Sequence, residues 1–209
     1  MRILVAGAGI GGLTAALALL RAGIDVDVYE QASELREVGA GLQLSANGTR
    51  LLYELGVGDE LKALSCEAEG KEIRLWNSGE SWKLFDLGAV SIERYGYPYF
   101  TVYRPDLLDV LARAVRREKA DCIHLGVKCT GFDQSKNKVS LHLDGRKAME
   151  ADALIGADGV HSQIRQGLFG ADRPDFTGVI AWRGVIPMER LPPHMARMIG
   201  TNWVGPGAT

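Results

Sequence analysis

The segment that most constrains the fold is an apolar run, residues 3–20, that is interrupted by a cluster of glycines. Gly7, Gly9 and Gly12 in this run match the G-x-G-x-x-G pattern of dinucleotide-binding turns. In that pattern the first glycine makes the turn, the second lets the backbone approach a pyrophosphate, and the third lets a helix pack on a strand. The run therefore predicts a strand, a tight turn that also contains Gly11, and a helix whose N-terminus can hold phosphates.

The residues after the turn strengthen this interpretation. Gly23 stands where a C′ glycine ends a helix, and residues 24–29 have the character of a second strand, which Glu30 follows. Glu30 lies close to the ~20-residue offset expected for the acid that binds a ribose hydroxyl. Because a carboxylate there would repel a 2′-phosphate, we expect the adenosine of FAD or NAD and not that of NADP. The alternative is an acid that ends a strand by chance, but strand, turn, helix and acid all stand in the expected order.

The composition limits the fold and the partners. At 209 residues, with 46% of them hydrophobic, the chain can form a core in one large domain or in one and a half typical ones. The net charge of −2 gives no reason to expect nucleic acid as a partner. The cysteines, without a C-x-x-C spacing, indicate a reducing compartment. His124 and His142 occupy strand positions with no second ligand nearby, so we expect no metal site.

Residues 3–20 carry no charge and are long enough to resemble a membrane span or a signal peptide. Their many glycines and alanines make the run weakly hydrophobic, and no cleavage pattern of small residues follows it. We therefore expect a soluble, cytoplasmic protein with no membrane partner.

Residues 38–43, with the sequence VGAGLQ, form another segment whose backbone can pass close to a ligand. Arg36 precedes this segment. From the residues alone, an ordinary surface loop with a solvated arginine explains the pattern equally well.

Residues 71–84 alternate between apolar and polar side chains around a turn at residues 77–79, which predicts a β-hairpin in a separate sheet. Tyr95, Tyr97 and Tyr99 then repeat at period two, which would place three phenol rings on one face of a regular strand. Such an aromatic stripe is more often core packing than a substrate pocket.

Residues 103–106, with the sequence YRPD, predict the start of a helix. Proline is favoured at the first helical position, and it holds the residue before it extended. Arg104 should therefore project from the beginning of this helix.

A further apolar strand, residues 153–156, runs into Asp158, Gly159 and the start of another helix. The Asp158 carboxylate could accept a hydrogen bond from a cofactor hydroxyl, Gly159 would give backbone access, and Ser162 can cap the helix. The alternative is an ordinary β-turn that contains a polar aspartate.

Taken in order along the chain, these segments resemble four successive motifs of the single-component FAD-dependent aromatic hydroxylases, a group that includes salicylate hydroxylase and 3-hydroxybenzoate 6-hydroxylase. The motifs are the glycine turn with Glu30, residues 38–43, residues 103–108 and residues 156–162. The resemblance covers the whole chain, and residues 178–184 look like a strand of the family's substrate-binding sheet.

The resemblance implies a set of FAD-binding residues. Glu30 would bind the adenosine ribose, Arg104 would reach the ribityl and pyrophosphate region, and Val127 would contact the adenine through its backbone. Arg36 and Gln43 would lie along the FAD. The complete predicted set is Gly7, Gly9, Gly11, Gly12, Glu30, Gln31, Arg36, Gly41, Gln43, Arg104, Val127 and the pair Asp158-Gly159, which the family associates with FAD and NAD(P)H.

The resemblance also implies an enzyme. FAD would be reduced by NAD(P)H as co-substrate, O2 would be captured as a flavin C4a-hydroperoxide, and one oxygen would be transferred to a small aromatic substrate such as salicylate or a hydroxybenzoate. A homo-oligomer is possible. Two other functions remain open: a non-catalytic FAD- or ADP-binding remnant, and an NAD-dependent dehydrogenase, which would explain the glycine turn but not Asp158-Gly159.

The predicted architecture is α/β: a doubly wound Rossmann-like FAD-binding domain of residues 1–70 and 103–174, with an inserted β-rich substrate domain of residues 71–102 and 175–209. Family members continue into further substrate-sheet strands, a Gly-Asp motif and a helical region. We therefore expect a C-terminally truncated chain that hydroxylates poorly as written, and no catalytic residue is predicted within it.

Overall fold

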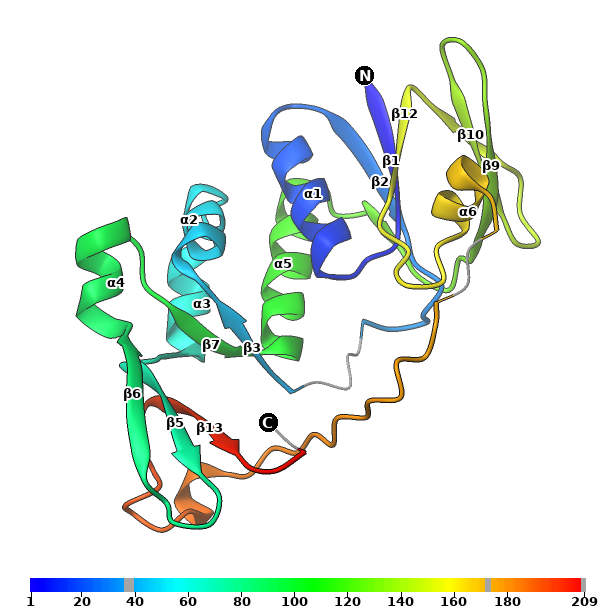
Figure 1. Ribbon diagram of the computed structural model, residues 1–209. Helices are drawn as coiled ribbons and strands as arrows, with labels where there is room; N and C mark the ends of the chain where they lie inside the picture. Colours follow the sequence, from blue (N-terminus) through cyan, green and yellow to red (C-terminus); the bar gives the residue numbers. More distant parts are fainter. Residues whose placement is uncertain (36–39, 172–173, 208–209) are drawn as a thin grey trace. The chain divides into compact units, whose positions relative to one another are not determined.

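The computed structural model describes residues 1–35, 40–171 and 174–207. The chain divides into two compact units, Met1–Val38 with Leu107–Ala181 and Gly39–Asp106 with Trp182–Thr209, and each is described by itself (Figure 1). The two domains expected from the sequence were defined by function, one for FAD binding and one for substrate binding. Their boundaries are not tested by this division into compact units and stay a prediction.

The first unit is built on a four-stranded parallel sheet with the order β12-β1-β2-β8. Its strands are β1 (Arg2–Ala6), β2 (Asp25–Tyr29), β8 (Ile123–His124) and β12 (Ala153–Gly156). The last residue of β1, Ala6, pairs with Tyr29 and with Gly156, the last residues of β2 and β12. The segments that follow these three strands therefore emerge at one edge of the sheet, which confirms the predicted α/β fold.

Helix α1 (Ile10–Arg21) packs against β1 and β2 through a buried stripe that includes Leu13 and Leu17. The helix ends at Ala22, and Gly23 adopts the left-handed conformation, with a φ of +76°, that was predicted for a C′ glycine.

Helix α5 (Arg104–Glu118) confirms the helix predicted from residues 103–106, and it buries its own apolar stripe. It begins one residue earlier than expected, directly after β7 (Phe100–Tyr103), so Arg104 is helical and is not an extended residue ahead of the helix. Pro105 fits the first turn of a helix because no intrahelical partner is needed there for its missing N–H.

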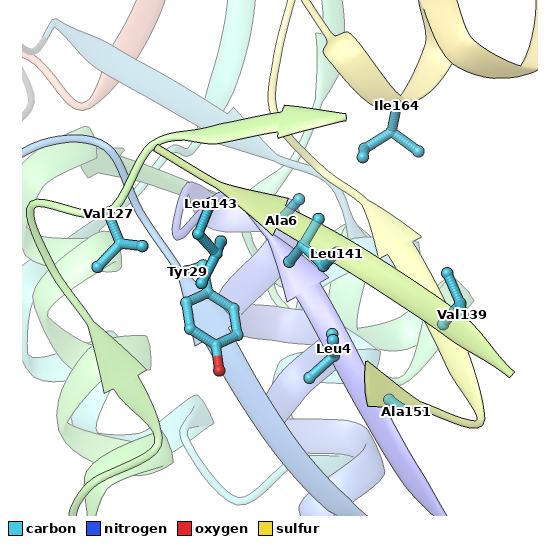
Figure 2. Close-up of a cluster of buried hydrophobic side chains, with 9 residues drawn as sticks. All are labelled: Leu4, Ala6, Tyr29, Val127, Val139, Leu141, Leu143, Ala151 and Ile164. Atoms are coloured by element: carbon cyan, nitrogen blue, oxygen red, sulfur yellow. The ribbon is translucent and has the colours of Figure 1, made fainter. Parts of the chain in front are cut away.

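A three-stranded antiparallel sheet covers the opposite face of β1 and β2. It consists of β9 (Cys129–Gln134), β10 (Val139–Leu143) and β11 (Met149–Ala151). Figure 2 shows Leu4 and Tyr29 of the parallel sheet beside Leu141 of β10 and Leu143, in a cluster that Ile164 of α6 (Gln163–Phe169) completes. The parallel sheet thus has a helix on one face and a second sheet on the other (Figure 1).

A cluster of charged side chains fastens β1, β2 and the segment after α5. The Asp27 side chain is 7% exposed, and its carboxylate accepts hydrogen bonds from Arg2 Nη2 at 2.6 Å and from Lys119 Nζ at 2.8 Å. His124 Nε2 lies 3.3 Å from Asp27 Oδ1, and Lys119 also donates to the exposed Asp25. Burial alone would raise the pKa of Asp27, but the hydrogen bonds from Lys119 and Arg2 outweigh it and hold that pKa below its ordinary value.

The second unit contains two small sheets, the α-helices α2, α3 and α4, and one short 3-10 helix among its described residues. One sheet is antiparallel with the order β3-β7-β4, and the other has the order β13-β5-β6. The hairpin predicted from alternation is confirmed, since β5 and β6 pair antiparallel, while β13 pairs parallel with β5. The elements are β3 (Gly41–Leu44), α2 (Ala46–Glu54), α3 (Gly58–Leu64), β4 (Ser65–Glu67), β5 (Gly70–Leu75), β6 (Ser81–Asp86), α4 (Gly88–Tyr95), β7 (Phe100–Tyr103), the short 3-10 helix η1 (Met188–Arg190) and β13 (Ile199–Val204).

The expected strand with three tyrosines on one face is wrong. Tyr95 is the last residue of α4, and Gly96 ends that helix in the left-handed conformation with a φ of +75°. The Tyr97 ring packs on Tyr53 of α2, with 5.8 Å between the ring centroids. Tyr99 precedes β7. The left-handed conformation of Gly96 interrupts any extended strand between Tyr95 and Tyr97, so the three rings do not share one face of a strand.

The expected strand at residues 178–184 is also not formed. No strand lies between β12 and β13 in the described part of the chain. A strand is stable only when a neighbour pairs with its backbone groups, and residues 178–184 have none among the described residues. Trp182 in this segment is 96% exposed.

Candidate functional site

The glycine turn between β1 and α1 depends on two close backbone contacts. Gly7 has a φ of +100°, and its N–H donates to the Tyr29 carbonyl at 2.8 Å. A Cβ on Gly7 would lie 2.3 Å from the Ala157 carbonyl oxygen, and a Cβ on Gly12 would lie 2.0 Å from the Gly7 carbonyl oxygen. Larger residues cannot occupy either position without moving the backbone, so the two glycines hold β1, α1 and the loop after β12 together.

The other two glycines of the turn have open space beside them. A Cβ on Gly9 or on Gly11 would meet no described atom within 4 Å. Helix α1 has no acidic residue in its first turn, and no described side chain caps its N-terminus. The first N–H groups of α1 therefore have no side-chain partner among the described residues, and the helix dipole favours negative charge near them. These features fit a pyrophosphate.

Glu30 lies at the same edge of the sheet, directly after β2. Its Oε2 accepts from the Ala8 N–H at 2.8 Å, and its Oε1 accepts from the Ala32 N–H at 2.9 Å. Two backbone amides thus hold the carboxylate against the glycine turn. Each oxygen keeps capacity to accept a further hydrogen bond, as a ribose hydroxyl would require.

Two further predicted residues adjoin Glu30. Gln31 follows it in the chain and is exposed. Val127 is buried, and its N–H donates to the Glu30 carbonyl at 2.8 Å. The fold thus brings Val127 beside Glu30 from far along the chain. Since the Val127 N–H is already used, only its carbonyl oxygen remains to contact an adenine.

The loop after β12 carries Asp158 and Gly159. The Ala157 N–H donates to the Ala6 carbonyl at 2.7 Å, which holds this loop beside the glycine turn. The Asp158 carboxylate accepts from Ser162 Oγ at 2.5 Å and from the Gln163 N–H at 2.7 Å. Asp158 therefore stabilises the beginning of α6, which favours the alternative of a structural turn for this side chain. A cofactor contact by Asp158 stays a prediction.

The same loop confirms one expectation about local structure and leaves another as a prediction. Gly159 has a φ of +80°, a conformation that favours glycine, but backbone access for a ligand at this position stays a prediction. Ser162 is the N-cap of α6, since its Oγ accepts from the Arg165 N–H at 2.9 Å.

The remaining predicted residues belong to the second unit. Gly41 begins β3 and pairs with Tyr103, the last residue of β7, and the Arg104 N–H donates to the Ala40 carbonyl at 3.3 Å. Gln43 Oε1 accepts from Tyr99 Oη at 2.8 Å and from Lys71 Nζ at 2.5 Å. Gly41 and Arg104 therefore lie at the same end of the β3-β7 pair, with Arg104 as the first residue of α5. Arg36 lies outside the described residues.

Sequence reasoning missed the surroundings of Cys129, which it considered only for its redox state. Burial is the main cause that raises the pKa of the Cys129 thiol to about 11, and the charges of Asp158 and Glu30 raise it further. Cys129 thus lies close enough to both carboxylates to feel their charge. The fold alone brings these three residues together, because no spacing in the sequence relates them.

Within residues 1–35, 40–171 and 174–207, no helix is long and apolar enough to cross a membrane. The same described residues contain no group of three or more His, Cys, Asp and Glu side chains that is arranged to hold a metal ion.

Comparisons with known proteins agree with this geometry. The sequence profile of a family described as "FAD binding domain" matches residues 1–202. The chain is 39% identical over 209 residues to 3-amino-4-hydroxybenzoate 2-monooxygenase PtnB3 of Streptomyces platensis, a match that covers 98% of this chain and 51% of that protein. It is 32% identical over 210 residues to 3-hydroxybenzoate 6-hydroxylase 1 of Aquipseudomonas alcaligenes, with 98% and 52% covered.

Among solved structures, the fold is similar to a tetrameric form of 2-methyl-3-hydroxypyridine-5-carboxylic acid oxygenase. The TM-score is 0.69 at 34% sequence identity, and the match covers 80% of this chain and 42% of the other. The chain spans about half the length of the curated relatives it matches.

Proposed function

Since the chain belongs to the FAD-binding family whose profile matches residues 1–202, we propose that it binds FAD for the hydroxylation of a small aromatic acid. The observation that carries this proposal is the Glu30 carboxylate, which the Ala8 and Ala32 amides hold against the glycine turn. The relatives named above act on aromatic acids according to their names.

The first unit would hold the adenosine diphosphate half of FAD. The N–H groups at the start of α1, beside Gly9, bind the pyrophosphate, and Glu30 accepts hydrogen bonds from the ribose hydroxyls. The Glu30 charge excludes a 2′-phosphate from the same place. In the second unit Gly41, Gln43 and Arg104 contact the FAD, and Arg104 does so through a charge-assisted hydrogen bond.

Bound FAD supplies the reaction's redox chemistry: it takes electrons from NAD(P)H and activates O2, so that one oxygen atom passes to an electron-rich ring. The protein binds and orients the cofactor and the ring and excludes water from them. Self-association of the chain is part of this proposal, because the similar oxygenase has a tetrameric form.

A non-catalytic FAD- or ADP-binding protein is the second candidate. It is favoured by the site itself, since the predicted residues that the structure describes are assigned to holding a nucleotide and none to chemistry. The dehydrogenase alternative rests on the glycine turn alone.

Two measurements separate these functions. The purified chain, incubated with FAD and passed through a desalting column, should retain the visible absorbance of oxidised flavin. A chain that retains NAD⁺ and no flavin would refute the proposal.

In the second measurement, addition of NAD(P)H and 3-hydroxybenzoate under air should consume NAD(P)H faster than addition of NAD(P)H without the aromatic acid. Because the chain spans about half the length of its relatives, we expect the electrons to appear mainly as hydrogen peroxide from the 209-residue polypeptide. Bound flavin that NAD(P)H never reduces would favour the second candidate.

Replacement of Glu30 by alanine should weaken FAD binding by about 1.5–3 kcal/mol, the range for loss of hydrogen bonds to a charged group. The discrimination between ADP and adenosine 2′,5′-bisphosphate as competitors should also fall, because the charge that repels the 2′-phosphate is gone. Fluorescence titration measures both effects. Glu150→Ala, which removes an exposed acid from the same unit, is the control and should leave both unchanged. Equal FAD affinity in Glu30→Ala and the parent would show that Glu30 does not bind the ribose.

A further inference from the structure

The second unit contains a cavity of about 510 Å³ beside helices α2 and α4. This volume lies within the ~300–1,000 Å³ range of small-molecule sites. Most of its walls are apolar or aromatic. The lining residues that matter here are Phe85, Asp86, Val90, Arg94, Tyr95 and Tyr99. Several of them are large apolar side chains with substantial exposure, namely 48% for Phe85, 41% for Val90 and 60% for Tyr95. Exposed apolar side chains gathered around a hollow mark a binding surface.

Hydrogen bonds between α4, α2 and the tyrosine segment fix the walls of this cavity. Ser91 Oγ donates to the Tyr97 carbonyl at 2.9 Å, and Thr49 Oγ1 donates to the Pro98 carbonyl at 2.8 Å. The Tyr97 ring packs on Tyr53, outside this set of lining residues. Its two neighbours in the tyrosine segment, Tyr95 and Tyr99, line the cavity.

The Tyr99 ring is held at two further points. Its hydroxyl donates to Gln43 Oε1 at 2.8 Å, and the Lys71 ammonium lies 5.7 Å from the ring centroid. A side chain that is fixed before a ligand arrives loses little entropy on binding. Tyr99 is therefore a preorganised aromatic wall.

The charge of the cavity comes from Arg94. Among the described lining residues, Arg94 is the one cation and Asp86 the one anion. Asp86 already forms an ion pair with Lys83, whereas the ion pairs found among the described residues include none of Arg94. The guanidinium at the end of α4 is thus available to an anion, and its planar fork matches a carboxylate.

We propose that this cavity binds the aromatic acid, with the ring against Tyr95 and Tyr99 and the carboxylate on Arg94, so that Arg94 selects acids over neutral rings. The inference rests on the proposed function, and it assigns a specificity residue to it. The charge fits the relatives' names, because 3-amino-4-hydroxybenzoate, 3-hydroxybenzoate and 2-methyl-3-hydroxypyridine-5-carboxylic acid all carry a ring carboxylate.

The test compares 3-hydroxybenzoate with 3-hydroxybenzamide, its neutral isostere, by isothermal titration of the FAD-loaded chain. The parent should prefer the acid, and Arg94→Gln should weaken acid binding by roughly 10- to 100-fold while leaving the amide unchanged. Arg94→Lys should recover part of the preference, because it keeps the charge and loses the fork. The matched control is Arg50→Gln, an exposed arginine of α2 in a surface pair with Glu54, which should change neither affinity.

A second variant tests the location. Val90→Trp should fill the cavity and weaken both ligands, with α4 intact by circular dichroism. If Arg94→Gln keeps the parent's preference for the acid, or if Val90→Trp binds both ligands as the parent does, the assignment of this cavity is wrong, although the proposed function survives. If the FAD-loaded parent binds neither ligand, both proposals fall.

Discussion

Alanine at position 12 is expected to destabilise the first unit by about 2–3 kcal/mol and to abolish FAD binding. The new Cβ would lie 2.0 Å from the Gly7 carbonyl oxygen, a backbone atom that cannot rotate away. Overpacking of this kind costs about 1–3 kcal/mol, with the upper part of the range expected where backbone must move. Movement of α1 away from Gly7 would also displace the N–H groups that we propose bind the pyrophosphate. Chemical denaturation and FAD titration measure the two effects.

The control for this variant is Gly11→Ala, one residue earlier in the same helical turn. Both substitutions gain the same helix propensity, about 1 kcal/mol for alanine over glycine. A Cβ on Gly11 meets no described atom within 4 Å, so Gly11→Ala should raise the free energy of unfolding by up to about 1 kcal/mol. The difference in the free energy of unfolding between Gly12→Ala and Gly11→Ala therefore measures the cost of the close contact with the Gly7 carbonyl. If Gly12→Ala were as stable as Gly11→Ala, the close packing of α1 on the turn would be refuted.

Asp27→Asn is expected to destabilise the first unit by about 3 kcal/mol at pH 7. The substitution keeps the shape of the side chain but leaves Lys119 and Arg2 without the buried charge that they share. Removal of one partner from a buried pair costs about 3–5 kcal/mol, and the lower value applies because Arg2 and Lys119 are partly exposed. Asp25→Asn is the control. Asp25 contacts the same Lys119 but its side chain is 54% exposed, so its replacement should cost less than about 1 kcal/mol.

The effect of Asp27→Asn should depend on pH. The pKa of Asp27 is lower in the folded chain than in the unfolded chain, where an aspartate has a pKa of about 3.9. The ionised carboxylate therefore stabilises the fold above about pH 4, and this stabilisation is lost as the pH falls through the folded pKa. Denaturation curves of the parent and of Asp27→Asn should converge over this acidic range. A stability difference that stays constant from pH 7 to pH 3 would show that charge is not the cause.

The parts of the fold that follow from local pattern were predicted from the sequence. The strand, turn and helix around Gly7, the C′ glycine Gly23 and the helix after Tyr103 each depend on residues within a few positions of one another. The position of Glu30 also follows, because β1 and β2 are adjacent parallel strands with one helix between them. Short-range chemistry fixes all of these features.

The features that depend on a distant partner were not predicted. Residues 178–184 have the composition of a strand, but a strand exists only where another backbone pairs with it. Tyr95 and Tyr99 line the same cavity, but Tyr95 lies at the end of α4 and Tyr99 in the loop before β7. A period-two strand pattern does not predict this arrangement. Cys129 reaches the two acids of the site only through the antiparallel sheet.

The parallel sheet of the first unit has a consequence for how the chain folds during synthesis. The Arg2 N–H donates to Asp152, 150 residues later, and β1 lies in the sheet between β2 and β12, so its second edge has no partner until β12 has been made. At ~5–20 residues per second, the ribosome needs roughly 6–25 s to pass from β2 to β12. During that interval the unpaired backbone N–H and C=O groups along this edge of β1 are open to wrong partners, whereas the intervening hairpin of β5 and β6 can already close. The order of the strands thus makes the pairing of β1 with β12 one of the last steps in forming this sheet, and non-local pairing of this kind slows folding.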